Sequence, residues 1–173
     1  MNFSMIFYLN CQFQSNESAG SLFFRNGNDA YLACTLADAF GADPVEIQPK
    51  TPYIRADLNW IDKHSRSTLE MRDPSARPEI ANVPINLGAY NTMFIAFPIW
   101  WYVAPNIVNI FPERCDLTGK TIIPFAISGG SGMGKTNKRL LPSCKCAKLE
   151  NGKVFPANAG METLRAWANG IQK

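Results

Sequence analysis

The sequence predicts an α/β fold in which helices cover both faces of a parallel sheet. Two runs, Thr92 to Phe97 and Thr121 to Ile127, are apolar without interruption, as strands buried on both sides of such a sheet require. Segments with apolar residues at helical spacing, such as Leu32 to Phe40 and Met161 to Ile171, alternate with the strand-like segments. This alternation is typical of a sheet wound on both sides through right-handed crossovers.

Length and composition fit a single domain over residues 1–173. The 173 residues are 46% hydrophobic and 18% charged, which is enough for a three-layer core. Residues 1–20 are expected to be either an extension or the first strand. The longest apolar stretches fall well short of the roughly 20 residues of a membrane helix, and the apolar start lacks the features of a signal peptide. We therefore expect a cytoplasmic protein.

Charge, histidine and cysteine usage argue against several functions. The net charge of +3 comes from scattered basic residues, so no nucleic-acid partner is expected. The single histidine, His64, rules out a site with several histidine ligands, and the five cysteines lack the spacing of a zinc site or a disulfide framework. We predict no metal site. Cys144 and Cys146 could form a redox pair, but two ordinary thiols in a reducing compartment are favoured.

Two segments compete for the first strand of the sheet. Asn2 to Leu9 and Ser21 to Phe24 both have strand composition, and the sequence does not decide between them. A turn at Arg25 to Asp29 leads into a helix that Gly41 ends. Val45 to Ile47 then predicts a short second strand.

A long irregular segment, Gln48 to Leu87, follows the second strand. It is rich in Pro, Arg and Asp and is too long for a plain connection, so we expect a short helix near Asp57 to Asp62. Tyr53 and Trp60 are expected to pack this segment onto the sheet. A place beside a ligand is the second interpretation of these two aromatic residues.

Proline and glycine mark the elements of the second half. Pro105 fits the first turn of a helix that contains Ile107 to Phe111. Pro124 lies inside a predicted strand, so its missing N–H must face a position without a partner. A brief helix is expected at Lys138 to Leu141. The turn at Asn151 and Gly152 predicts either a broken last strand or a small hairpin.

Ligand-binding features follow two neighbouring strands. Trp100, Trp101 and Tyr102 come directly after the first apolar run, where a core does not need three aromatic residues. The second run ends in SGGSGMGKT, where glycine lets backbone N–H groups approach a ligand closely. Because the carboxyl ends of parallel strands meet at one sheet edge, we predict a ligand site between these loops. Alternatively, two of the three aromatic residues cap the core beneath the next helix.

The segment Gly129 to Thr136 also fits the phosphate-binding loop of P-loop NTPases. In that chemistry Lys135 would reach the outer phosphates and Thr136 would hold magnesium. Such a loop normally opens its sheet, whereas here few residues follow it and none of them forms an apolar run ending in Asp. The NTPase is therefore the weaker hypothesis.

Taken together, these features resemble the flavodoxin family, in particular its branch with PIWW and SGGSG loops. The likeness extends from about Leu22 to Trp167 and includes GAD, PYIRADLNW, ARPEI, FPIWWYVAP, GKTIIPFAISGGSGMGKT and VFPAN. The resemblance implies a flavodoxin-like three-layer sandwich with a five-stranded parallel sheet. It also implies that flavin mononucleotide (FMN) binds at the carboxyl ends of the strands.

The resemblance assigns cofactor-binding residues in three groups. The FMN phosphate would lie at a helix N-terminus against Arg25, Asn26, Gly27, Asn28 and Asp29. One side of the flat isoalloxazine ring would be covered by Pro98, Ile99, Trp100 and Trp101. Backbone donors to the polar edge of the ring would come from Ser128, Gly129, Gly130, Ser131 and Gly132. No side chain is predicted to be catalytic, because the cofactor carries the chemistry.

The phosphate loop departs from the family pattern. With Gly27 on the family glycine, Phe24 and Asn26 stand where the family has hydroxyls and Asp29 where it has threonine. The carboxylate of Asp29 would then face the FMN phosphate. Two unit charges of the same sign about 4 Å apart repel by roughly 4 kcal/mol at an effective dielectric constant of about 20. The positive charge of Arg25 could offset part of this repulsion.

Two functional hypotheses follow. In the first, the chain binds FMN for electron transfer or for reduction of a small acceptor such as a quinone, its partner being a redox protein or that acceptor. In the second, it is a flavodoxin-shaped binding module without flavin. The family's simple carriers are acidic, whereas this chain has a pI of about 8.6, which favours a reductase.

Overall fold

All strands of the computed structural model join one parallel sheet in the order β2-β1-β3-β4, with β5 and β6 both pairing with β4. The structure describes residues 3–7, 35, 37–38, 42–81, 87–156 and 158–171. The strands are β1 (Phe3–Phe7), β2 (Asp43–Glu46), β3 (Thr92–Pro98), β4 (Thr121–Ser128), β5 (Lys148–Leu149) and β6 (Lys153–Pro156). The helices are α2 (Arg66–Arg72), α3 (Ile107–Glu113), α4 (Thr136–Leu140), the 3₁₀ helix η1 (Leu141–Ser143) and α5 (Met161–Ile171).

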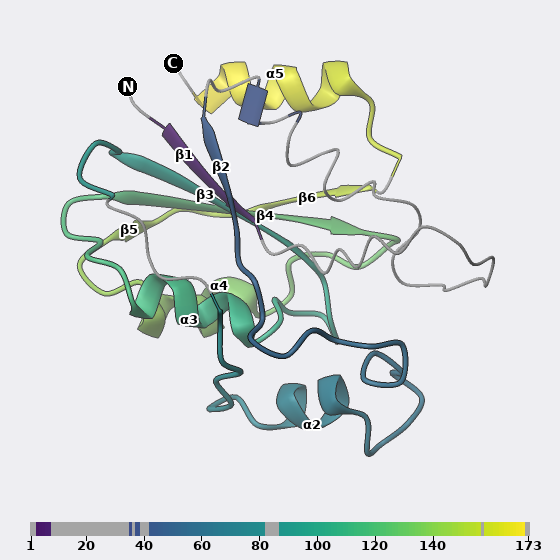
Figure 1. Cartoon of the computed structure of the whole chain (residues 1–173). Helices are drawn as coiled ribbons and strands as arrows, with labels where there is room; N and C mark the ends of the chain where they lie inside the picture. Colours follow the sequence, from purple (N-terminus) through teal and green to yellow (C-terminus); the bar gives the residue numbers. More distant parts are fainter. Residues whose placement is uncertain are drawn as a thin grey trace.

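The arrangement confirms the predicted three-layer α/β fold. Figure 1 shows α5 on one face of the sheet and α3 and α4 on the other. Of the two segments that competed for the first strand, Phe3–Phe7 pairs with both β2 and β3. Its rival, Ser21 to Phe24, lies outside the described residues, as does most of the helix predicted after Arg25 to Asp29.

The last strand of the sheet is broken opposite Pro124. β5 pairs with Thr121 and Ile122, whereas β6 pairs with β4 from Phe125 onward. The carbonyl oxygen of Pro124 lies 2.8 Å from the position of a Cβ on Gly152, so its backbone polar groups point toward the break. Neither β5 nor β6 pairs with Pro124, so no carbonyl of a neighbouring strand lacks a partner because proline has no N–H. The sequence prediction for Pro124 is confirmed.

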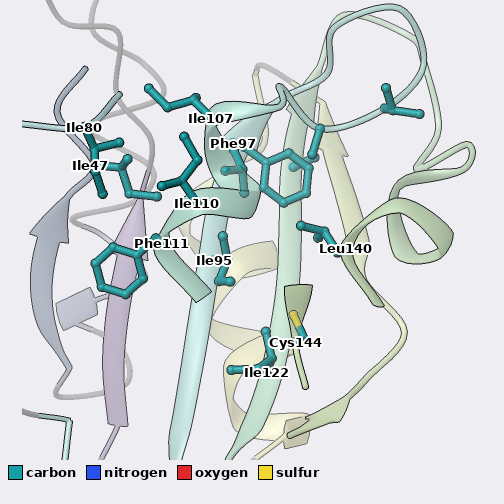
Figure 2. Close-up of a cluster of buried hydrophobic side chains, with 14 of the residues drawn as sticks. Ile47, Ile80, Ile95, Phe97, Ile107, Ile110, Phe111, Ile122, Leu140 and Cys144 are labelled. Atoms are coloured by element: carbon teal, nitrogen blue, oxygen red, sulfur yellow. The ribbon is translucent and has the colours of Figure 1, made fainter. Parts of the chain in front are cut away.

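Two apolar clusters fill the two sides of the sheet, which explains the uninterrupted apolar runs. On the side of α3 and α4, the cluster includes Ile95, Phe97, Ile107, Phe111, Ile122 and Leu140 (Figure 2). On the side of α5, the cluster includes Phe94, Ala96, Phe125, Phe155 and Leu164. Alternate residues of β3 and β4 thus enter opposite cores, as strands buried on both faces do.

Helix α5 confirms the apolar stripe predicted for the C-terminal segment. Leu164 is fully buried, and the ring of Trp167 meets Phe94, Phe125 and Phe155 edge-on at centroid distances of 5.1 to 6.0 Å. Such edge-to-face pairs stabilise beyond the area that they bury. No helix in the described part of the chain combines the length and apolar character that a membrane crossing needs.

The segment Gln48 to Ala81, here called the excursion, leaves the sheet after β2 and returns to its starting point. Its ends pair through Pro49 and Ile80, and Figure 1 shows it carrying α2 below the sheet. The helix predicted near Asp57 to Asp62 is wrong, because those residues form turns. The carboxylates of both Asp residues accept nearby backbone N–H groups, which competes with helix formation.

The helix of the excursion is α2, which begins at Arg66, after the predicted segment has ended. Its N-cap is Ser65, whose hydroxyl accepts the backbone N–H of Thr68 at 3.3 Å. The remaining helices lie near their predicted positions. Pro105 precedes α3 by two residues, and α4 begins at Thr136, two residues before the predicted start.

Candidate functional site

The two predicted ligand loops lie side by side at the carboxyl edge of the sheet. We call residues Ile99 to Ala104 the aromatic loop and residues Gly129 to Lys135 the glycine loop. They follow β3 and β4, which pair along their whole length with Pro98 opposite Ile127. The prediction that these strand tips converge is thereby confirmed.

The aromatic loop is a tight turn made by two residues that rarely form one. The backbone of Trp100 and Val103 exchanges two hydrogen bonds, of 2.8 and 3.0 Å. Between them Trp101 and Tyr102 have φ angles of 44° and 66°, the left-handed geometry of a type I′ turn that Asn and Gly normally supply. Each costs about 1 to 2 kcal/mol in this conformation. The turn holds both side chains outward, 41% and 70% exposed.

Trp100 differs from its two neighbours because it is 5% exposed and belongs to the core. Its ring meets Tyr53 edge-on at a centroid distance of 5.6 Å and Trp101 at 6.5 Å. The alternative in which two of the three aromatic residues cap the core is therefore wrong, since one of them does so. Trp101 and Tyr102 remain available to a ligand.

Two residues of the SGGSGMGKT segment fasten the glycine loop to the aromatic loop. Gly134, with φ at +52°, lies so close to Tyr102 that a Cβ would stand 2.0 Å from its carbonyl oxygen. The hydroxyl of Thr136 is fully buried and accepts the backbone N–H of Ala104 at 3.0 Å. The threonine that would hold magnesium in a P-loop is thus a structural link, which argues against the NTPase hypothesis.

A pocket of about 290 Å³ lies between the loops and the excursion. Its lining residues are Leu58, Trp60, Ile99, Trp100, Trp101, Tyr102 and Ser131. Among the predicted cofactor-binding residues, Ile99, Trp100, Trp101 and Ser131 line it. Pro98 ends the strand beneath it, and Ser128, Gly129, Gly130 and Gly132 flank Ser131 without lining the pocket.

The glycine loop is organised by Ser128. Its hydroxyl accepts the backbone N–H groups of Gly130 at 3.2 Å and Ser131 at 2.7 Å. Two of the N–H groups predicted to face a ligand therefore bond within the loop. A Cβ added at Gly129, Gly130 or Gly132 would meet no other described atom within 4 Å, so the loop backbone borders open space. The role of Ser128 to Gly132 toward a ligand stays a prediction.

The cofactor site predicted from the sequence omits three of the lining residues. Leu58 and Trp60 come from the excursion, where Trp60 was expected to pack onto the sheet and is in fact 51% exposed. Tyr102 belongs to the same aromatic run as Trp101 but is not among the residues that the resemblance assigns to the cofactor. One feature of the sequence could have indicated Leu58 and Trp60 as lining residues. They are apolar residues in a segment rich in charged side chains, within the family-like stretch PYIRADLNW.

The remaining predicted site residues and the cysteines add little to this picture. Arg25 to Asp29 lie outside the described residues, so their role with a phosphate stays a prediction. Burial raises the pKa of Cys115 and of Cys144 to about 11. Cys144 is buried while Cys146 is exposed, and the described residues contain no group of three or more potential metal ligands.

Comparisons with known proteins show which family the chain is similar to. Residues 20–171 match the family model described as Flavodoxin. Crystal structures from Bacteroides eggerthii and Bacteroides uniformis, both named as candidate flavoproteins, are 34% identical and have TM-scores of 0.82 and 0.83. Each match covers 99% of this chain and 98% of the other. No curated protein sequence matched the chain.

A more distant structure shares the fold. It is the FMN complex of a flavoprotein from Lactobacillus acidophilus, with 12% identity, a TM-score of 0.61 and coverage of 94% of this chain and 97% of the other. The predicted cofactor, FMN, agrees with the family and with this fold. From the family match, the 34% identity over nearly the whole chain and the converging loops, we conclude that the chain belongs to the flavodoxin family.

Proposed function

We propose that the chain binds FMN with its isoalloxazine ring in the pocket and uses it to reduce a small planar acceptor such as a quinone. The observation that carries the proposal is the pocket between the aromatic loop, the excursion and Ser131 of the glycine loop. An aromatic wall suits the apolar faces of a flat tricycle, and the glycine loop suits its polar edge. The fit is supported by the open space beside Gly129 and Gly132, where no other described atom lies within 4 Å of a Cβ position and a ligand edge could approach the backbone.

FMN supplies the redox chemistry when it is bound, so the protein's task is to bind, orient and shield it. Trp101 offers a partly exposed indole for stacking, held in place by the strained turn. The glycine loop keeps bulky side chains away from the ring edge, and Ser128 fixes its shape. Leu58 from the excursion closes the pocket on a further side.

The exposed rim of the pocket supports a small acceptor rather than a docking protein. Trp60 and Tyr102 line the pocket and are 51% and 70% exposed, so their rings can contact a second planar molecule. The basic pI of about 8.6 gives the chain the opposite charge balance to that of the family's acidic carriers. The cytoplasmic location expected from the sequence remains part of this proposal.

We assign the phosphate end of FMN to Arg25 through Asp29, as the family resemblance implies. The carboxylate of Asp29 opposes a phosphate if the two face each other. Asp29→Thr should therefore tighten FMN binding by about one power of ten or more. Unchanged affinity would show that Asp29 turns away from the phosphate and acts as a helix cap.

The first experiment is the visible spectrum of the purified protein, with mass spectrometry of the molecule released on denaturation. We expect a yellow protein that releases FMN. Trp101→Phe should weaken FMN binding several-fold, while the matched control Trp167→Phe, in α5 on the other side of the sheet, should not. A colourless protein that fails to quench the fluorescence of added FMN would contradict the proposal and favour a binding module without flavin.

The second experiment follows reoxidation of the reduced protein by benzoquinone in a stopped-flow instrument. We expect fast reoxidation that saturates with quinone concentration. Trp60→Ala should raise the quinone concentration needed for half-saturation without changing FMN content. A reaction that shows no saturation, or that Trp60→Ala leaves unchanged, would show that the acceptor does not bind at the pocket.

A further inference from the structure

Tyr53 supports the pocket from behind without lining it. Its side chain is 2% exposed, although it belongs to the excursion rather than to the sheet. Its ring meets the indole of Trp100, a lining residue, at a centroid distance of 5.6 Å and an interplanar angle of 87°. An edge-to-face contact restricts the orientation of both rings, so whatever fixes Tyr53 also fixes Trp100.

Tyr53 is itself fixed by an ion pair. Its hydroxyl donates to Glu70 at 2.5 Å, and the other carboxylate oxygen of Glu70 accepts Nε of Arg66 at 2.8 Å. The guanidinium of Arg66 lies 4.0 Å from the centre of the Tyr53 ring and also donates to the carbonyl of Thr51 at 2.7 Å. The charge-assisted hydrogen bond to Glu70 and the guanidinium over the ring thus both hold one buried phenol.

The helix that carries this ion pair is anchored beside the aromatic loop. The side-chain amide of Asn106, two residues beyond Ala104, donates to the backbone carbonyls of Glu70 and Asp73 at the C-terminus of α2. Asn106 is buried, and these carbonyls are among those that a helix end leaves unpaired. The excursion therefore contacts the aromatic loop through Tyr53 and Trp100, and contacts Asn106, just beyond that loop, through the end of α2.

We propose that Tyr53 is a positioning residue that sets the indole orientation of Trp100 and, through it, the environment of the flavin ring. This inference rests on the proposed function. A binding group needs a supporting shell that locks its rotamer, and the network of Tyr53, Glu70 and Arg66 supplies one. An apolar residue at position 53 would fill the same space but would not fix the angle between its side chain and the indole of Trp100.

The test compares Tyr53→Phe with Tyr90→Phe, which removes a phenol hydroxyl at the opposite, amino end of β3. In the flavin-free protein, Tyr53→Phe should shift the indole N–H resonance of Trp100, assigned through Trp100→Phe. In the FMN-loaded protein it should change the shape of the visible flavin bands and weaken FMN binding by about three- to tenfold. Arg66→Met should act in the same direction, because it removes the cation over the ring.

The outcomes separate the two proposals. A Trp100 resonance and a flavin spectrum that stay unchanged in Tyr53→Phe, even with a lower unfolding midpoint, would overturn the positioning role and leave FMN binding untouched. Equal effects of Tyr90→Phe would overturn it too, by showing a general loss of stability. A wild-type protein that binds no FMN would overturn the proposed function, and the role of Tyr53 toward flavin with it.

Discussion

Gly134 lies so close to Tyr102 that the carbonyl oxygen of Tyr102 fills the space in which another residue at position 134 would carry its Cβ. The contact joins the glycine loop to the strained turn of the aromatic loop. It also explains the likeness to a P-loop, because the glycine and the threonine of the GKT motif are needed for packing rather than for a nucleotide.

Gly134→Ala should therefore destabilise the protein by about 2 to 4 kcal/mol. The left-handed φ of +52° costs alanine about 1 kcal/mol, and relief of the 2.0 Å contact requires a backbone shift. Urea unfolding followed by circular dichroism measures the change. Gly132→Ala is the matched control, because its Cβ would meet no other described atom within 4 Å, and it should change stability by less than about 0.5 kcal/mol. Equal losses in both variants would refute the packing role of Gly134.

Thr136→Val should cost about 1 to 3 kcal/mol of unfolding free energy. Valine has the same shape but leaves the buried N–H of Ala104 without its acceptor. Thr136→Ser keeps the hydroxyl and should retain more stability at this site. Thermal unfolding of the two variants makes the comparison, and a valine variant as stable as the wild type would show that the hydrogen bond is dispensable.

Tyr102→Gly should stabilise the protein by about 0.5 to 1 kcal/mol while it weakens ligand binding. Glycine adopts the φ of 66° without steric cost, and little packing is lost from a side chain that is 70% exposed. Tyr102→Phe keeps both the strain and the ring, so it should leave stability unchanged. A glycine variant that is less stable than the wild type would mean that the tyrosine ring contributes more packing than its exposure indicates.

Glu113 should make stability depend on pH in the acid range. Partial burial would raise the pKa of Glu113, but the hydrogen bonds from Arg77 and Ser143 outweigh it, so the pKa falls below the ordinary value of 4.5. Arg77 pairs with both carboxylate oxygens, at 2.9 and 3.0 Å, and so ties the excursion to α3. A lowered pKa in the folded state means that this stabilisation is present above pH 4.5 and is lost as the pH falls.

The variant Glu113→Gln should lose about 1 kcal/mol at pH 7, and its difference from the wild type should shrink below pH 4.5. Urea unfolding at a series of pH values measures this. Glu79→Gln, in the exposed ion pair with Lys50, is the matched control and should have the smaller effect. A difference that stays constant down to pH 3 would contradict the lowered pKa of Glu113.

Features that depend only on short segments of the chain are predictable from the sequence. The apolar runs of β3 and β4 and the apolar stripe of α5 follow from periodicity, and the position of Pro124 follows from its missing N–H. The turn at Asn151 and Gly152 predicted a broken last strand or a hairpin, and the structure has the broken strand. The helix of the excursion does not lie where the sequence predicts it, because Asp57 and Asp62 bond to nearby backbone in turns. Apolar spacing does not reveal that competition.

The sequence by itself indicated the parallel sheet and the two loops that follow its neighbouring strands, because uninterrupted apolar runs, helical spacing and glycine content are properties of short segments. Only the tertiary structure decided which aromatic residues of the loop are buried and which are exposed. Trp100 is buried against Tyr53, whereas Trp101 stays exposed, although the two are adjacent in the chain. Burial depends on what the rest of the chain brings to each side chain, and here that was the distant excursion, which also placed Trp60 at the pocket.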